Sequence, residues 1–146
     1  EGVKEAREYY RTELAEDVDL VLSNAYSKAN EAGLALRQGN MSLNKEKGGD
    51  FVLVAHTPEG LAPHYHLGRW GKSRVGGWEW NEKESIPERI NNLIIFSKYI
   101  DRGGNWWYGP EDEFRWEKDW DKIKELVGKD DKKVALYPDA TIQLIR

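Results

Sequence analysis

The histidines of this 146-residue chain, His56, His64 and His66, all lie within a short segment near its middle. Histidine changes charge near neutral pH, and it is also the commonest metal ligand in proteins. The residues that follow His66 include Arg69, Lys72 and Arg74, whose positive charges bind anions. The candidate catalytic residues are therefore His56, His64, His66, Arg69 and Lys72.

The sequence around the histidines predicts a β-hairpin over residues 51–70. Phe51–Ala55 is an apolar run rich in valine, which is typical of a strand buried on both faces. A loop rich in proline and glycine follows, and His64 and His66 then alternate along a second strand, so their rings share one face. If His56 lies opposite His64, all three rings meet at one end of the sheet. A slip of one residue would instead place His56 on the other face.

The residues from 64 to 78 include no acidic side chain, which favours an anionic substrate. Histidines can act as general acid and base on a phosphodiester, while Arg69 or Lys72 stabilises the charge on phosphate. Nearby aromatic rings offer surfaces for unpaired bases. These features predict a metal-independent ribonuclease, with RNA as the substrate. The expected substrate-binding residues are Tyr65, Trp70, Arg74 and Trp78.

Two other functions fit the sequence. His56, His64 and His66 could hold zinc through three nitrogens and leave one position for water, as in a zinc hydrolase. The second alternative is a non-catalytic interaction domain that binds a protein or a glycan through the loop Trp106–Tyr108, since three consecutive large aromatic residues cannot all point inward. Trp116 and Trp120, in contrast, lie on a helical stripe and are expected in the core.

Composition narrows the class of protein. Apolar residues make up 39% and charged residues 33% of the chain, as in an ordinary globular domain. The net charge of −4 argues against wrapping duplex DNA. No stretch approaches the roughly 20 apolar residues of a membrane span. The chain has no cysteine, which excludes disulfides and thiolate chemistry, and it begins at Glu1, which suggests a piece of a longer protein.

Hydrophobic periodicity and turn residues predict an α+β fold, in which helices flank an antiparallel sheet. Ser85 and Glu88 form a capping-box pattern at the start of one expected helix, and Gly128 is the expected C-cap of another. A single domain over residues 1–146 is expected. Its predicted parts are N-terminal helices (1–40), the histidine-rich hairpin (51–70), two helices (85–102 and 110–128) and a C-terminal hairpin (133–145).

The segments Pro63-His64-Tyr65-His66 and Leu136–Thr141 resemble parts of the C-terminal toxin domains of bacterial polymorphic toxins of the Rhs type. This resemblance implies secretion as part of a larger bacterial protein and action in the cytoplasm of a target cell. It also implies a cognate inhibitor protein, which would present carboxylates to the cationic site.

Overall fold

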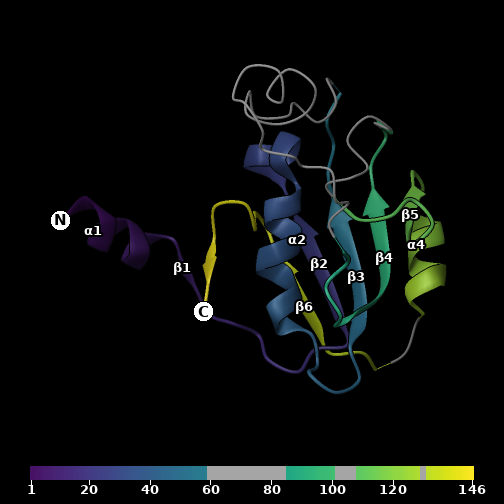
Figure 1. The fold of residues 1–146 in the computed structure, drawn as a ribbon, viewed down its shortest axis with the longest axis horizontal. Helices are drawn as coiled ribbons and strands as arrows, with labels where there is room; N and C mark the ends of the chain where they lie inside the picture. The colour runs from purple at the N-terminus through teal and green to yellow at the C-terminus, as the bar shows by residue number, and fades with distance from the viewer. Residues whose placement is uncertain (59–84, 101–107, 129–130) are drawn as a thin grey trace.

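The computed structural model describes residues 1–58, 85–100, 108–128 and 131–146. Its centre is a five-stranded sheet in the order β5-β4-β3-β2-β6, and every neighbouring pair is parallel (Figure 1). Outside it, two short strands form a second parallel pair. The strands are β1 (Arg11–Thr12), β2 (Leu20–Asn24), β3 (Gly49–Val54), β4 (Ile90–Phe96), β5 (Phe114–Glu117), β6 (Val134–Tyr137) and β7 (Leu144–Ile145).

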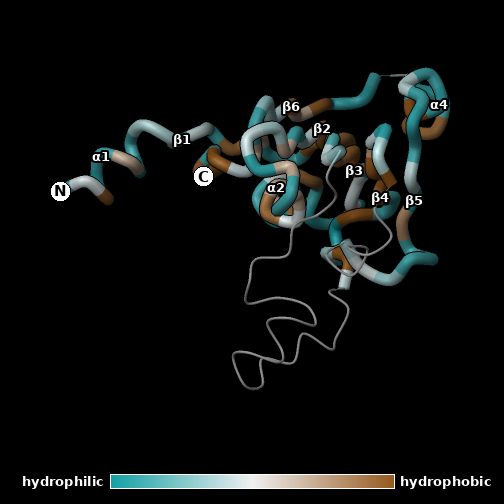
Figure 2. The backbone as a smooth tube through the Cα atoms, turned by 90° about the horizontal axis from the view of Figure 1, so that it is seen from above, coloured by the Kyte–Doolittle hydropathy of each residue, from teal (hydrophilic) through white to brown (hydrophobic). Residues whose placement is uncertain are grey.

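Helices lie on both sides of the sheet (Figure 2). Helix α2 (Gly33–Gly39) covers one face of the sheet over β2 and β3. Helix α4 (Trp120–Val127) lies on the opposite face, near β4 and β5. Two 3-10 segments flank α2, namely η1 (Tyr26–Glu31) and η2 (Asn40–Ser42). Helix α1 (Gly2–Tyr9) buries none of its residues and projects from the body of the fold.

The core has two layers because successive strand residues face opposite sides of the sheet. Phe51 and Leu53 belong to the layer beneath α2, whereas Val52 belongs to the layer that Ile123 and Val127 of α4 close. Since β3 has a strand on each side and a packed layer on each face, it lies at the centre of the fold. The sequence-based expectation of a strand buried on both faces is confirmed here.

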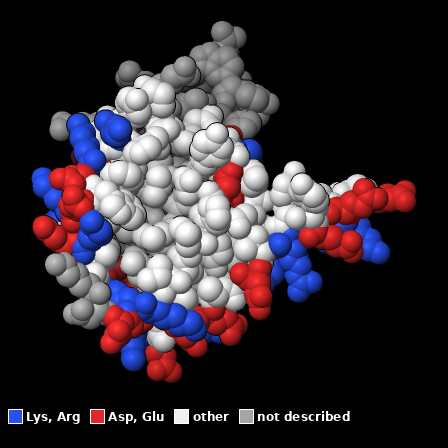
Figure 3. Space-filling view, turned by 180° about the vertical axis from the view of Figure 1, so that it is seen from behind, with Lys and Arg blue, Asp and Glu red and all other residues white. Residues whose placement is uncertain are grey.

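The side of the sheet that carries α4 is covered only in part. Val134 and Leu136 of β6 are exposed on it, and Leu22 of β2 is half-buried. Figure 3, which views the molecule from behind relative to Figure 1, faces this side and shows uncharged surface across its middle and charged side chains at its margins.

The expectation of an antiparallel sheet is wrong, because the five-stranded sheet is parallel and the fold is therefore α/β. The error began with residues 85–102, which were expected to be a helix. Residues 90–96 form β4 instead, because Leu93, Ile94 and Ile95 are all buried and so pack on both faces. A continuous apolar run fits the pattern of a buried helix as well as that of a buried strand, so periodicity alone cannot distinguish the two.

Other expected elements also differ from the structure. The N-terminal helical region (1–40) contains β2, and the expected helix 110–128 is divided into β5 and α4. Residues 133–145 form no hairpin, since β6 pairs with β2 while β7 pairs with β1. The expected hairpin over 51–70 is wrong for its first strand, because β3 pairs in parallel with β2 and β4. Its residues from 59 onward lie outside the described part of the chain. The C-cap at Gly128 is confirmed, with a positive φ of 76°.

Replacing Gly49 with alanine is expected to lower the free energy of unfolding by about 1–3 kcal/mol. The new Cβ would lie 2.5 Å from the carbonyl oxygen of Asp19. That oxygen also accepts a hydrogen bond from the backbone N–H of Asp50, so it cannot move without separating β2 from β3. Urea unfolding measures the change. Gly2→Ala is the control, since its Cβ would meet no atom within 4 Å; equal losses in both variants would contradict the close approach.

Candidate functional site at the carboxyl ends of the strands

Among the described residues, the best candidates for binding and catalysis lie together at the carboxyl ends of β3 and β4. Because the strands are parallel, their carboxyl ends meet at one edge of the sheet, where open α/β folds usually bind their ligands. His56 follows β3 at this edge, and Lys98 follows β4. The backbone N–H of Ala55 donates to the carbonyl of Phe96 at 3.0 Å, which holds the two chain ends together.

His56 is held in a defined protonation state. Its Nδ1 accepts a hydrogen bond from the backbone N–H of Lys98 at 3.3 Å, which requires an unprotonated Nδ1. Partial burial lowers the pKa of His56 below 6.5, and the positive charge of Lys98 lowers it further. The neutral ring therefore carries its proton on Nε2. Such a ring can donate a hydrogen bond to a substrate oxygen at neutral pH.

Part of this burial comes from an aromatic neighbour. The ring of His56 packs against Phe96, with centroids 5.0 Å apart, and Phe96 contacts Trp120 at 5.3 Å. Phe96 is the last residue of β4, and Trp120 is the first residue of α4. The histidine is thus positioned by one strand end, one backbone hydrogen bond and one ring.

Asp139 organises another part of the same edge, between β2 and β6. Its carboxylate accepts hydrogen bonds from the backbone N–H of Ser27 at 3.1 Å and from Thr141 Oγ1 at 2.6 Å. Burial opposes ionisation of Asp139, but these hydrogen bonds outweigh it and lower its pKa. With both of its oxygens engaged, Asp139 serves to join the loops after β2 and β6.

Of the catalytic residues expected from the sequence, the structure places only His56. The others, His64, His66, Arg69 and Lys72, lie outside the described residues, as do the expected substrate-binding residues Tyr65, Trp70, Arg74 and Trp78. The chain enters that segment just after Pro58, directly beyond the carboxyl end of β3. Their participation in a site at this edge remains a prediction.

Sequence reasoning missed Lys98 and assigned Trp120 to the core. Lys98 was included in the expected helix 85–102, so its position just beyond a strand end was not recognised. Trp120 shares a helical stripe with Ile123 and Val127, yet 39% of it is exposed. Asp119, which caps α4 by accepting from the backbone N–H of Asp121, was the available signal that the helix begins at Trp120.

One of the three aromatic residues of the loop Trp106–Tyr108 is not available as a binding surface. Tyr108 is only 1% exposed, and its ring contacts Phe114 and Trp116 at 5.7–5.9 Å. It therefore belongs to the core, whereas Trp106 and Trp107 lie outside the described residues. The other alternative, a zinc site, would need His64 and His66, which are also outside them. Within the described ranges, no His, Asp or Glu side chains gather in a group of three or more that could hold a metal.

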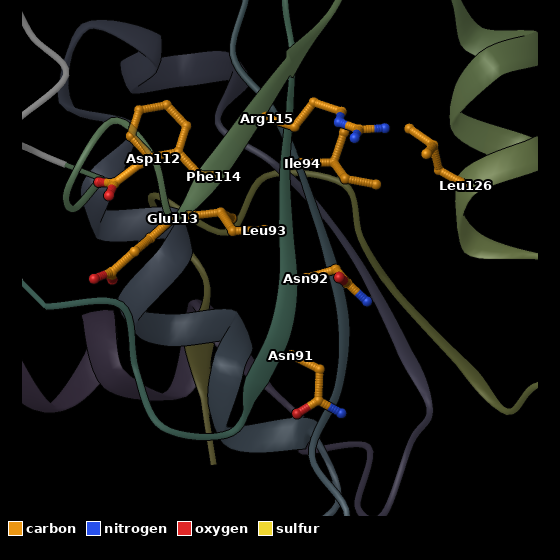
Figure 4. Close-up of a pocket in the computed structure, with 9 residues that line it drawn as sticks. All are labelled: Asn91, Asn92, Leu93, Ile94, Asp112, Glu113, Phe114, Arg115 and Leu126. Carbon is orange, nitrogen blue, oxygen red and sulfur yellow. The ribbon is translucent and has the colours of Figure 1, made fainter.

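A groove of about 310 Å³ lies elsewhere, along β4 and the edge strand β5 (Figure 4). The amide nitrogens of Asn91 and Asn92 line it, but they already donate to Lys47 O and Asp50 Oδ1. Figure 4 shows the carboxylates of Asp112 and Glu113 pointing away from the Arg115 guanidinium. Its charged groups do not converge, so we favour the edge with His56. The lining residues are Asn91, Asn92, Leu93, Ile94, Asp112, Glu113, Phe114, Arg115 and Leu126.

Comparisons of the chain with protein family models and with curated proteins find no match. In the part of the chain that the structure describes, no helix has the length and apolar character needed to cross a bilayer. The class of the protein therefore rests on its fold, a parallel α/β sheet with a histidine and a lysine at the carboxyl ends of adjacent strands.

Proposed function

We propose that this chain is an enzyme domain that binds an anionic substrate at the carboxyl ends of β3 and β4. His56 donates a hydrogen bond from Nε2 to a substrate oxygen on which negative charge develops, and Lys98 attracts the anion. The observation that carries the proposal is the hydrogen bond from the Lys98 backbone N–H to His56 Nδ1, since it leaves Nε2 as the donor. Neutral histidine donors of this kind stabilise developing oxyanions in enzymes.

The reaction class that we propose is hydrolysis of a phosphodiester. Water forms a bond to phosphorus, the bond from phosphorus to the leaving oxygen breaks, and the proton of the water passes to solvent, while negative charge builds on the oxygen that His56 contacts. This role modifies the acid and base role expected from the sequence, because a neutral Nε2–H is a hydrogen-bond donor rather than a base. RNA is the first substrate to test, since a phosphodiester supplies both the anion and the oxygen. The cations among residues 64–78 favour a polyanion as the substrate, as expected from the sequence.

The pH dependence of turnover tests this proposal. Purified protein is incubated with bulk RNA and, separately, with bis(p-nitrophenyl) phosphate, both in EDTA, between pH 4.5 and 8. A proton on Nδ1 would break the hydrogen bond from the Lys98 backbone N–H that orients the ring. Turnover should therefore increase with pH through the lowered pKa of His56 and stay level above 6.5. In Lys98→Gln one cause of the lowering is removed, so the acid limb should shift upward toward 6.5.

Lys45→Gln is the matched control, because Lys45 is an exposed lysine in the loop before β3, at the other end of that strand. It should leave both the rate and the position of the acid limb unchanged. Lack of turnover of either substrate would overturn the hydrolytic proposal. An acid limb that stays in place both in Lys98→Gln and in His56→Gln would show that His56 is not the titrating group.

A further inference from the structure

The rings of His56, Phe96 and Trp120 form a continuous aromatic row at the edge with the candidate site. The two successive contacts have centroid separations of 5.0 and 5.3 Å and interplanar angles of 56° and 62°. The row crosses three elements, since its members follow β3, end β4 and begin α4. We call these three residues the aromatic row.

Trp120 is exposed although its helix has an apolar side. Ile123 and Val127 of α4 are 1% and 7% exposed and close the core, while Trp120 keeps 39% of its surface accessible. Leaving a large indole in water forgoes a substantial part of its possible burial energy. Its packing against Phe96 directs the ring to the edge of the sheet, where a ligand can cover the exposed part.

The charges around the aromatic row differ between its two ends. Lys98 lies next to His56, so an anionic group is favoured at that end. At the other end, Glu117 is the register partner of Phe96, Lys118 follows it, and Asp119 caps α4. The two carboxylates outnumber the one lysine, and they can accept hydrogen bonds from the amino groups of a heterocycle.

We propose that the aromatic row binds the base of a nucleotide, with Trp120 stacking on the base and the phosphate placed at His56 and Lys98. This inference rests on the proposed function and names its substrate class. Stacking on an exposed aromatic ring is the general means by which proteins hold an unpaired base. The platform consists of described residues and does not include Tyr65, Trp70 or Trp78, the aromatic residues that the sequence predicts to bind substrate.

The experiment titrates the full chain with three probes and follows the indole N–H signal of Trp120 by NMR, assigned through Trp120→Phe. The probes are AMP, ribose 5-phosphate, which lacks the base, and adenosine, which lacks the phosphate. AMP should bind more tightly than either of the others and should shift the Trp120 signal. Trp120→Ala should weaken AMP binding about tenfold or more, and Trp120→Phe should retain most of the affinity.

Tyr9→Ala is the control, because Tyr9 is a more exposed aromatic residue on α1, away from the site; it should leave AMP binding unchanged. Equal affinities for AMP and ribose 5-phosphate, both lost in Lys98→Gln, would show that the base does not stack on Trp120. Such a result would contradict the inference and support only an anion site at His56 and Lys98. Binding of adenosine as tightly as AMP, unaffected by Lys98→Gln, would contradict the phosphate position. Lack of binding by all three probes would overturn the inference, while hydrolysis of bis(p-nitrophenyl) phosphate would still support the proposed function.

Discussion

Replacing His56 with alanine is expected to lower turnover by about 100- to 1,000-fold, the usual cost of removing one donor to a developing oxyanion. The substitution removes Nε2–H and leaves the Lys98 backbone N–H without its acceptor. The loss should appear mainly in kcat, because the charge on the oxygen grows only as the transition state is approached. Single-turnover kinetics with the substrate identified by the assays above measure it.

The variant His56→Gln tests whether His56 acts as a hydrogen-bond donor or as a general base. Glutamine also carries an N–H donor at the end of its side chain, so it should restore part of the activity lost in the alanine variant. It cannot accept a proton near neutral pH, so a general base would lose as much activity in glutamine as in alanine. Since His56 is only partly buried and lies outside the hydrophobic core, both variants should keep the wild-type circular dichroism spectrum. Equal loss in both variants would reject the donor role that the Lys98 hydrogen bond indicates.

Phe51→Ala is expected to lower the free energy of unfolding by about 3–5 kcal/mol. Phe51 has no exposed surface and lies in the central strand, beneath α2. A Cβ placed on Gly39 of α2 would come within 3.0 Å of the Phe51 ring, which shows how closely the helix approaches it. Removing the ring therefore opens a cavity between helix and sheet that neither can readily fill. Urea unfolding monitored by tryptophan fluorescence measures the loss.

Leu136→Ala is the matched control for Phe51→Ala. Leu136 is also an apolar residue in a strand of the same sheet, but it is 65% exposed. Its truncation should change the free energy of unfolding by less than about 0.5 kcal/mol. A loss at Leu136 as large as that at Phe51 would mean that the α4 side of β6 is covered in solution.

The sequence alone determined the central strand. The run from Phe51 to Ala55 has enough consecutive apolar residues to be buried on both faces, and the structure places it in the middle of the sheet. Gly128 was likewise identified as a helix end, because a helix commonly ends in a residue with positive φ and glycine adopts it without strain. These features depend on local composition and conformation. A strand buried on both faces is also typical of a parallel sheet, so the apolar run by itself indicates the parallel class that the structure has.

Strand direction and the partners of His56 were decided only by the tertiary structure. Apolar periodicity does not distinguish a buried strand from a buried helix, so β4 was expected to be helical and Lys98 was placed within that helix. Nothing near His56 in the sequence indicates Lys98, Phe96 or Trp120, which follow it by 42, 40 and 64 positions. Parallel pairing between β3 and β4 brings Phe96 and Lys98 beside His56, and the packing of α4 adds Trp120. The chemistry of a single residue is therefore encoded locally, but its protonation state and its neighbours arise from long-range pairing.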